Sequence, residues 1–395
     1  MSAALEPRTA AELAAAVAES GGPLEIIGAG SKRGLGRPVN SGGLLDLSRL
    51  SGIILYEPEE LVLTAGAGTP LAEIEQALAE KKQMLAFEPP DLGPLYGRPA
   101  SQGTLGGMLA CNLAGSRRPK AGAARDHFLG ALAVNGQGEI FKTGGRVVKN
   151  VTGYDLCKLL AGSFGTLAAL AEVTMKVLPA PEHERTLAIS GPDDAKAVSL
   201  MTRALGSAAD VSAAAHLPAG IAPSLAGDGG ATLLRLEGTA ISITERLALL
   251  RRELGETGTE LEGAASREAW QSVRDLQPFH GTEEALWRLS VPPAEGASVM
   301  RAIAASGLGP ARHFYDWGGG QIWLALPATG DAGAARIRSA LTRGHATLMR
   351  APLPLRAAVD VFQPQEPALA TLARRIKESF DPGGRLNPGR MYQGI

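Results

Sequence analysis

The sequence contains only two cysteines among its 395 residues, Cys111 and Cys157. So small a number argues against a disulfide scaffold or a structural zinc site, and it fits a reducing compartment. Neither cysteine has a partner at CxxC spacing, so the sequence motif of a redox-active cysteine pair is absent. Cys111 stands in a predicted helix, where we interpret it as a small packed hydrophobe.

An excess of one charge is also missing. The 39 lysines and arginines balance 40 aspartates and glutamates, the formal net charge is −1, and no basic block interrupts this balance. Such a chain has no broad attraction to nucleic acid or to an anionic membrane. We therefore predict no nucleic-acid partner.

Long apolar runs are absent as well. Charged residues interrupt the apolar stretches well before the roughly 20 residues needed to span a bilayer. The chain starts with a helix signal at Thr9 and Glu12 instead of a basic segment and an apolar core, so no signal peptide is predicted. We expect a cytoplasmic protein without direct membrane insertion, whose association with the inner membrane would come through partner subunits.

The motifs of several enzyme classes do not occur. There is no HExxH, no HxxH pair, no G-x-S-x-G and no Walker A sequence. No metal site is predicted, because the histidines lie far apart in the sequence: His127, His183, His216, His280, His313 and His345. The chain has glycine-rich loops instead, which indicate a cofactor that brings its own chemistry.

The first of these loops, Gly28–Gly36, follows a short apolar strand expected over Pro23–Ile27. Its sequence GAGSKRGLG does not fit the G-x-G-x-x-G dinucleotide fingerprint, because the third glycine would fall at Arg33 and no helical pattern follows. The turn Gly66–Gly68 fails in the same way, at Leu71. The first loop predicts a backbone nest for a pyrophosphate, and an ordinary structural turn is the alternative.

The second glycine-rich stretch, Ser101–Gly115, turns directly into a helix. Thr104 is the expected N-cap, and leucine and methionine recur behind it at helical spacing. Glycine and alanine leave the opposite face almost without side chains. We expect this bare face and the exposed N-terminal amides to receive a flat or anionic ligand; close packing against a neighbouring helix is the alternative.

The pattern of predicted secondary-structure elements changes near Pro181. Before it, short strands and helices alternate with glycine turns, and Thr69 is the expected cap of a helix that runs to about Lys82. From about Glu184 the order β-α-β-β-α occurs twice, with a closing strand in each half. We predict a helix-backed antiparallel sheet there, hence an α+β protein, followed by a helix over Pro364–Lys377 and a docked tail.

Several sequence blocks occur in a telling order: GAGSKRG, AGAG, TLGGMLACNLAG with Arg125-Asp126, KNVTGYDLCKLLAGSFGTLAALAEVTMKVLP and the final FDPGGRLNPGR. Together they resemble the FAD-binding p-cresol methylhydroxylase/vanillyl-alcohol oxidase family, over about Thr9–Pro181 and the tail. The resemblance implies a two-subdomain FAD-binding domain over 1–182 and a ferredoxin-like cap with an antiparallel sheet over 183–351. The C-terminal segment, 352–395, would return to the FAD domain.

The resemblance also implies which residues hold the cofactor. Backbone amides of the first loop would bind pyrophosphate or ribityl groups, the second glycine stretch would run along the FAD, and the tail would come back towards the flavin. The implied FAD-binding residues are Ala29, Gly30, Ser31, Lys32, Gly36, Pro90, Gly103, Thr104, Gly106, Gly107, Asn112, Gly115, Glu172, Val173 and Asn387.

Two departures from the family pattern matter. Members with covalent FAD use a histidine in the glycine loop, where this chain has Ser31-Lys32-Arg33, so we predict non-covalent FAD. Similar 2-hydroxy-acid dehydrogenases hold a metal with cap histidines, and this cap has no such set. Oxidation of a 2-hydroxy acid needs a base and a cation for the carboxylate. The catalytic residues are therefore unknown, and the candidates are Lys149, Arg125, His313 and Tyr315.

Within the family, the short cap and Trp317–Gly320 favour the FAD-binding subunits of multi-subunit glycolate oxidases, which convert a small 2-hydroxy acid, glycolate, to glyoxylate. The resemblance implies a sister FAD subunit and an iron–sulfur subunit as partners, since this chain lacks the cysteines for such clusters. Two alternatives stay open. One is a self-sufficient FAD-dependent 2-hydroxy-acid dehydrogenase, and the other is a scaffold subunit with a degenerate flavin site.

Overall fold

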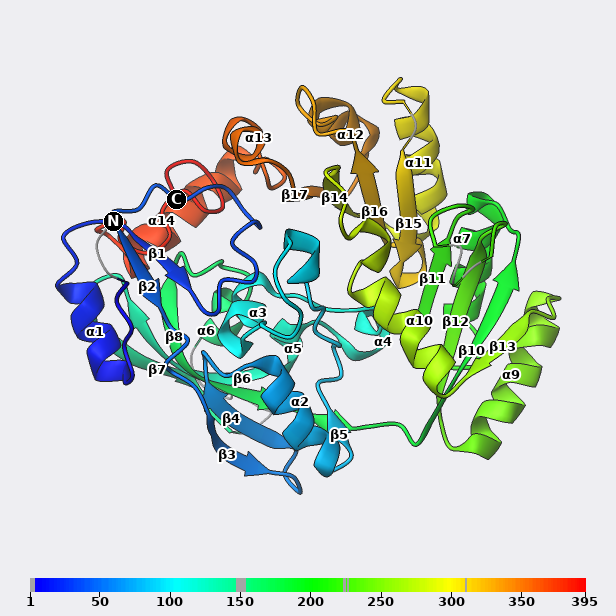
Figure 1. Ribbon diagram of the computed structural model, residues 1–395, viewed down its shortest axis with the longest axis horizontal. Coiled ribbons are helices and arrows are strands. Elements are labelled where there is room, and N and C mark those ends of the chain that lie inside the picture. The colour runs from blue at the N-terminus through cyan, green and yellow to red at the C-terminus, as the bar shows by residue number, and fades with distance from the viewer. Residues whose placement is uncertain (1–3, 147–153, 223–224, 226, 310) are drawn as a thin grey trace. The chain divides into compact units, whose positions relative to one another are not determined.

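The computed structural model describes residues 4–146, 154–222, 225, 227–309 and 311–395 (Figure 1). The chain divides into two compact units. Unit 1 comprises Met1–Ala114, Gly122–Ala180 and Pro364–Ile395, and unit 2 comprises Gly115–Ala121 and Pro181–Gln363. The domain boundaries expected at 182 and 351 stay a prediction. The structure adds that the segment after the second glycine stretch packs with unit 2.

Unit 1 is built on a five-stranded antiparallel sheet in the order β3-β4-β8-β6-β7. Two short pairs, β1–β2 and β5–β9, complete its strands. The strand expected over Pro23–Ile27 is present as β1. The bounds are β1 (Leu24–Ile27), β2 (Gly43–Asp46), β3 (Ile53–Glu57), β4 (Val62–Gly66), β5 (Gln83–Met84), β6 (Phe128–Asn135), β7 (Ile140–Gly144), β8 (Ala168–Lys176) and β9 (Leu178–Pro179).

Two of the three predicted helix caps of unit 1 are confirmed. The hydroxyls of Thr9 and Thr104 accept hydrogen bonds from the third residue of their helices. Thr69 is not a cap: its hydroxyl donates to Gly66 O at 2.7 Å and so ties the preceding turn. The helices are α1 (Ala10–Ala18), α2 (Leu71–Glu80), α3 (Leu105–Cys111), α5 (Ala124–His127), α6 (Leu156–Leu160), α14 (Pro367–Phe380) and the 3-10 turn Pro94–Tyr96.

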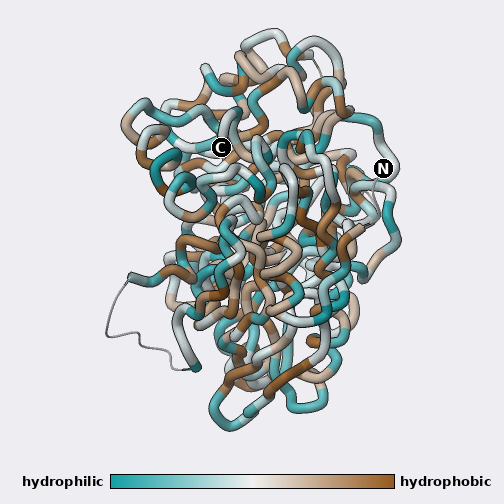
Figure 2. Tube along the Cα trace, turned by 90° about the vertical axis from the view of Figure 1, so that its left-hand side faces the viewer, coloured by the Kyte–Doolittle hydropathy of each residue, from teal (hydrophilic) through white to brown (hydrophobic). Residues whose placement is uncertain are grey.

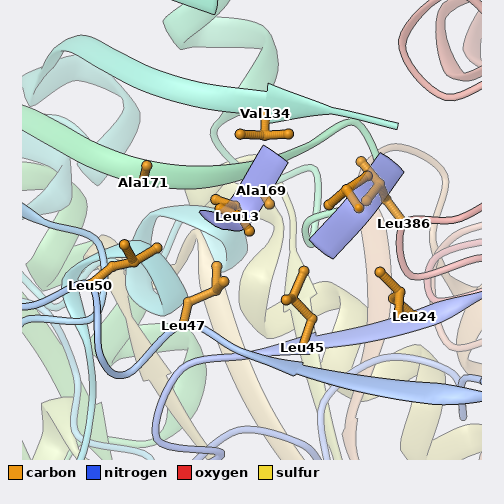
Figure 3. Packing of buried hydrophobic residues seen from close by; sticks show 10 residues of the cluster. Leu13, Leu24, Leu45, Leu47, Leu50, Val134, Ala169, Ala171 and Leu386 are labelled. Carbon is orange, nitrogen blue, oxygen red and sulfur yellow. The ribbon is translucent and has the colours of Figure 1, made fainter. Parts of the chain in front are cut away.

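The core of unit 1 joins the two ends of the chain. Leu13, Leu45 and Leu386 are all 0% exposed and lie in one leucine-rich cluster. Figure 3 shows Leu45 of β2 and Leu47, just after this strand, pointing towards Leu13. Leu386 forms a parallel bridge with Leu24, so the C-terminal tail continues the β1–β2 pair. Burial of this apolar surface is what docks the tail, as the sequence predicted.

Unit 2 carries one antiparallel eight-stranded sheet in the order β13-β10-β12-β11-β15-β16-β14-β17. Two β-α-β-β-α-β halves meet at the β11–β15 contact, which confirms the predicted duplication. The elements are β10 (His183–Ser190), α7 (Asp194–Leu205), β11 (Ala213–Leu217), β12 (Ala231–Gly238), α9 (Ala240–Leu254), β13 (Thr259–Glu262), α10 (Ala264–Arg274), β14 (Ala285–Ser290), α11 (Gly296–Ala305), β15 (Arg312–Asp316), β16 (Gln321–Leu326), α12 (Ala334–Ala340), β17 (His345–Arg350) and α13 (Leu353–Ala358).

The closing strand of the first half, β13, is the element whose position the sequence did not reveal. Its residues read Thr-Glu-Leu-Glu, and it pairs only with β10 at the edge of the sheet. Short, charged edge strands protect a sheet against further pairing. They also bury few side chains, so they leave no apolar alternation to recognise.

The segment Gly115–Ala121 is anchored inside unit 2. The Trp317 indole donates to Gly115 O at 3.0 Å, and the Ser116 hydroxyl donates to Asp316 Oδ2 at 2.8 Å. The glycines after Trp317 allow close packing, since a Cβ on Gly319 would lie 2.6 Å from a backbone oxygen. This glycine run is therefore a tight turn of the cap.

No helix among the described residues is long and apolar enough to cross a membrane. Figure 2 shows the same feature along the whole trace, where short apolar stretches are interrupted by polar ones.

Candidate functional site

Two adjoining cavities of unit 1 lie where the loop after β1 meets α3. Both are lined by Ile26, Gly28, Phe164 and Asn387. The first is also lined by the rest of the loop, and the second by residues of β8. The residues implied by the resemblance that line these cavities are Ala29, Gly30, Ser31, Lys32, Thr104, Gly106, Gly107 and Asn387.

The residues Gly28–Lys32 line the first cavity, and none of their five consecutive backbone amides has an acceptor within the described ranges. The following part of the loop is closed by its own bonds, from Arg33 N to Gly30 O and from Leu35 N to Lys32 O. Gly30 has φ +72°, a conformation that suits glycine. Unpaired amides in series are the donor set that binds phosphate oxygens. The loop thus has the donors that the predicted nest requires, and its role as a pyrophosphate site stays a prediction.

Lys32 adds a cation to the same wall. Its Nζ donates to Ser31 Oγ at 3.2 Å. A Cβ on Gly103 or Gly107 would lie 3.8 Å from this Nζ, so the ammonium lies over two side-chain-free positions. Burial lowers the pKa of Lys32, while the nearby Cys111 and Asp91 act in the opposite direction. A bound anion would stabilise the charged form.

The N-terminal amides of α3 are not available, which corrects the expectation that they receive the ligand. Leu105 N donates to Thr69 O at 3.0 Å and Gly106 N donates to Ala67 O at 2.7 Å, both in the turn before α2, and Gly107 N donates to Thr104 Oγ1. A Cβ on Gly106 would lie 2.8 Å from the Ala67 side chain. Part of the bare face thus serves close packing, and Gly107 remains on the cavity wall.

Asn387 is brought to both cavities by the C-terminal tail. It is 4% exposed and has φ +42°. Its Oδ1 accepts from Ile26 N at 2.8 Å, and its Nδ2 donates to Phe164 O at 2.7 Å. The side chain therefore joins β1 to the Ser163–Gly165 turn. This positions two walls of the cavities relative to each other.

Two further implied residues lie beside the loop and line neither of the two cavities. Gly36 has φ +86°, and a Cβ there would lie 3.1 Å from Arg390 O. The Gly103 carbonyl accepts from Leu71 N at 2.8 Å, which holds the second glycine stretch against α2.

The remaining implied residues lie elsewhere. Asn112 ends α3 at φ +47°, and its Oδ1 accepts from a backbone amide of α5. Pro90 is buried in the proline-rich loop, and Glu172 and Val173 lie within β8. Gly115 belongs to unit 2. Their roles in FAD binding stay predictions.

Of the four catalytic candidates, Lys149 lies outside the described residues. Arg125 is exposed on α5 of unit 1. His313 and Tyr315 come together in unit 2, where both contact one carboxylate: Tyr315 OH donates to Asp194 Oδ2 at 2.7 Å, and His313 Nε2 lies 2.9 Å from the same oxygen. No group of three or more metal ligands occurs in the part of the chain that the structure describes.

The sequence did not single out two members of this cluster, Asp194 and His216. His216 is 1% exposed, its Nδ1 lies 3.0 Å from Thr232 Oγ1, and its Nε2 lies 3.7 Å from Asp194 Oδ1. The cluster depends on the pairing of His216 with Tyr315 across β11 and β15. Such a pairing between strands far apart in the sequence leaves no local spacing signal.

The environment of the cluster fixes its protonation. Burial lowers the pKa of His216 to about 4, so this imidazole is neutral at pH 7. Burial raises the pKa of Tyr315, and the nearby Asp194 raises it further. Burial acts to raise the pKa of Asp194, but bonds from His313 and Tyr315 outweigh it and the pKa falls. The carboxylate is charged at neutral pH and Tyr315 keeps its proton.

The donor set of unit 1 fits an FAD. Amides and an ammonium suit the pyrophosphate, and Ile26, Ile27 and Phe164 provide apolar contact beside them. The loop approaches α3 so closely that a Cβ on Gly28 would lie 2.3 Å from Thr104 Oγ1. The nest therefore depends on a glycine at this position.

Comparison with known proteins agrees with this fit. A family model described as an FAD binding domain matches residues 1–144. Glycolate oxidase subunit GlcE of Escherichia coli K12 is 37% identical over 371 residues, which cover 94% of this chain and 93% of that protein. Glycolate oxidase subunit GlcD of Bacillus subtilis is 34% identical over 152 residues, 38% of this chain and 30% of that protein.

The fold is shared more widely than the sequence. A crystal structure of p-cresol methylhydroxylase with bound substrate superposes with a TM-score of 0.73 at 15% identity, over 98% of this chain and 88% of that chain. The α+β fold of this family, implied by the sequence blocks, is confirmed. The similarity to GlcE extends over nearly the whole length of both proteins, beyond the FAD-binding region. The chain therefore belongs to the family of FAD-linked oxidoreductases that includes glycolate oxidase subunit GlcE.

Proposed function

We propose that this protein is an FAD-binding subunit of a glycolate oxidase, which oxidises the 2-hydroxy acid glycolate to glyoxylate. The observation that carries the proposal is the run of unpaired amides at Gly28–Lys32 beside the Lys32 ammonium, in a chain similar to GlcE along nearly its whole length.

The bound FAD would supply the acceptor for the hydride that leaves the substrate. The residues of this chain hold and orient the cofactor. The Gly28–Lys32 amides donate to phosphate oxygens, Lys32 offsets their charge, and Asn387 keeps β1 in place relative to the Ser163–Gly165 turn. Absence of a histidine at Ser31-Lys32-Arg33 supports non-covalent binding.

The proposal includes a complex with partner subunits. A sister FAD subunit related to GlcD would carry out or share substrate oxidation, and an iron–sulfur subunit would take the electrons onward. Two cysteines are too few for a cluster in this chain, which supports a separate iron–sulfur partner. Association of the complex with the inner membrane would then be peripheral and made through these partners.

The test is a visible spectrum followed by anaerobic addition of glycolate, with acetate as the control acid. We expect the purified chain to be yellow with FAD, to stay oxidised alone, and to become reduced by glycolate when the sister subunit is present. Reduction of the chain alone would establish a self-sufficient dehydrogenase instead. A colourless protein that takes up no added FAD would establish a scaffold subunit.

A further inference from the structure

Unit 2 contains a cavity of its own, of about 730 Å³, which none of the FAD-binding residues lines. It lies at the junction of the two β-α-β-β-α-β halves. Its walls come from the start of α7, the ends of β11 and β15 that meet there, and one face of α11. Volumes of this size suit small-molecule ligands.

One buried polar atom on this wall, His216 Nε2, has no hydrogen-bond partner among the described residues. Asp194 Oδ1 lies 3.7 Å from it, too far for a direct hydrogen bond, while the other carboxylate oxygen is occupied by His313 and Tyr315. An unsatisfied buried polar atom costs free energy, so His216 Nε2 calls for a ligand group from the cavity. The same group can reach Asp194 Oδ1, whose side chain is 32% exposed.

The nature of that group follows from the two atoms. The charged Asp194 carboxylate accepts hydrogen bonds only, whereas neutral His216 Nε2 either accepts or donates according to its tautomer. A hydroxyl satisfies both atoms by donating to Asp194 Oδ1 and accepting from His216. An ammonium satisfies both by donating twice. A group without a donor leaves Asp194 Oδ1 unpaired.

The wall of the cavity also carries a cation. Arg301, on α11, lines the same cavity and is exposed, and none of its guanidinium donors has a partner in the described ranges. The carboxylate of Asp193, also on the wall, is engaged in capping α7 through Lys196 N at 2.8 Å. Arg301 is thus available for an anion, and a guanidinium pairs well with a carboxylate.

We infer that this cap cavity is a binding site for a small carboxylic acid that also carries a hydroxyl or ammonium group, with the donor group between His216 and Asp194 and the carboxylate on Arg301. The inference does not rest on the flavin chemistry proposed above, because every residue in it belongs to unit 2.

The test is isothermal titration calorimetry on the full-length, FAD-loaded protein with two matched sets of acids. Glycolate, glycine and acetate form the short set, and malate, aspartate and succinate form the longer one. Each set holds a hydroxyl member, an ammonium member and a member with neither. We expect at least one hydroxyl or ammonium member to bind about tenfold or more tightly than the unsubstituted acid of its set.

The variants are Arg301→Gln and a matched control, Arg252→Gln, which removes another exposed arginine of unit 2, on α9. Arg301→Gln should weaken binding of the preferred acid about tenfold or more, and Arg252→Gln should leave it unchanged. Since both side chains are exposed, both variants should fold.

Histidine side-chain ¹⁵N spectra locate the ligand. The resonances of His216 and His313 are assigned with the variants His216→Gln and His313→Gln. On titration with the preferred acid, the resonances of these two histidines should shift, while the chemical shifts of the other histidines should not change. Equal or absent binding by all six acids contradicts the inference, as does binding that Arg301→Gln leaves intact. An acid that alters the flavin spectrum without moving the His216 resonance also contradicts it, and that result would leave the proposed function standing.

Discussion

Asn387 Oδ1 accepts a hydrogen bond of 2.8 Å from the backbone amide of Ile26, across 361 positions of the sequence. The bond ties the last turn of the chain to the first strand, directly before the loop that presents five unpaired amides. A residue from the tail thereby shapes the part of unit 1 that we propose to hold FAD.

Replacement of Asn387 should impair both stability and FAD retention. Asn387→Ala removes the side-chain hydrogen bonds to Ile26 N and Phe164 O, so the free energy of unfolding should fall by about 1–3 kcal/mol. Asn387→Gly, which relieves the φ of +42°, should lose FAD as readily. Urea unfolding and flavin absorbance per chain measure the two effects. Asn135→Ala is the control, since its bonds stay within the β6–β7 hairpin; FAD loss from this control would refute the specific role of Asn387.

The tail is held in place by a buried ion pair, so Lys377→Met should destabilise unit 1. Lys377 Nζ donates to Asp381 Oδ2 at 2.5 Å and to the carbonyls of Thr166 and Leu386. Removing one partner of a buried pair costs about 3–5 kcal/mol. Lys120→Met breaks an exposed pair with Asp210 and should cost about 1 kcal/mol or less in the same denaturant titration. Equal losses from the two variants would contradict the structure.

Lys32→Gln should weaken FAD binding about tenfold, or about 1.4 kcal/mol, because a cation beside the proposed pyrophosphate site is lost. Arg33→Gln is the matched control. Arg33 is more exposed and is already paired with Glu25, so its loss should change FAD affinity little. Equilibrium titration of the flavin-free protein with FAD measures both affinities. An unchanged affinity of Lys32→Gln would exclude the loop as the pyrophosphate site.

Acid should reduce stability through His216. Its pKa is about 4 in the folded protein against about 6.5 in the unfolded chain, so between these values the unfolded state binds the extra proton. The free energy of unfolding should therefore fall as pH drops from about 6.5 to about 4, by about 3 kcal/mol from this group. His216→Gln should lose this part of the pH dependence. His345→Gln, which removes an exposed histidine, should retain it when denaturant unfolding is measured across the pH range.

Precipitation with acid should release the flavin. Without a histidine at Ser31-Lys32-Arg33 to form a bond to FAD, the pellet should be colourless and the supernatant yellow. A flavin that remains in the washed pellet would overturn the prediction of non-covalent binding. Absorbance of both fractions measures the outcome.

The order of elements was determined by the sequence itself. Apolar alternation, glycine turns and caps such as Thr104 act over a few residues, and the same short-range preferences shape the folded strands and helices. The loop Gly28–Lys32 belongs to this class, because consecutive small residues after a strand are enough to predict its unpaired amides. The duplicated order of unit 2 was likewise visible in the sequence.

Only the tertiary structure determined the contacts between segments that lie far apart in the sequence. The tail reaches Ile26 through Asn387, and the neighbouring carboxylate and imidazole of Asp194 and His216 meet where β11 joins β15. The N-terminal amides of α3 were expected to be exposed, yet the first two donate hydrogen bonds to carbonyls of the turn before α2. Such contacts are set by strand register and by burial of the whole core, which local spacing does not encode. For this reason the sequence located the loop of unit 1 that we propose to hold FAD, but not the polar cavity of unit 2.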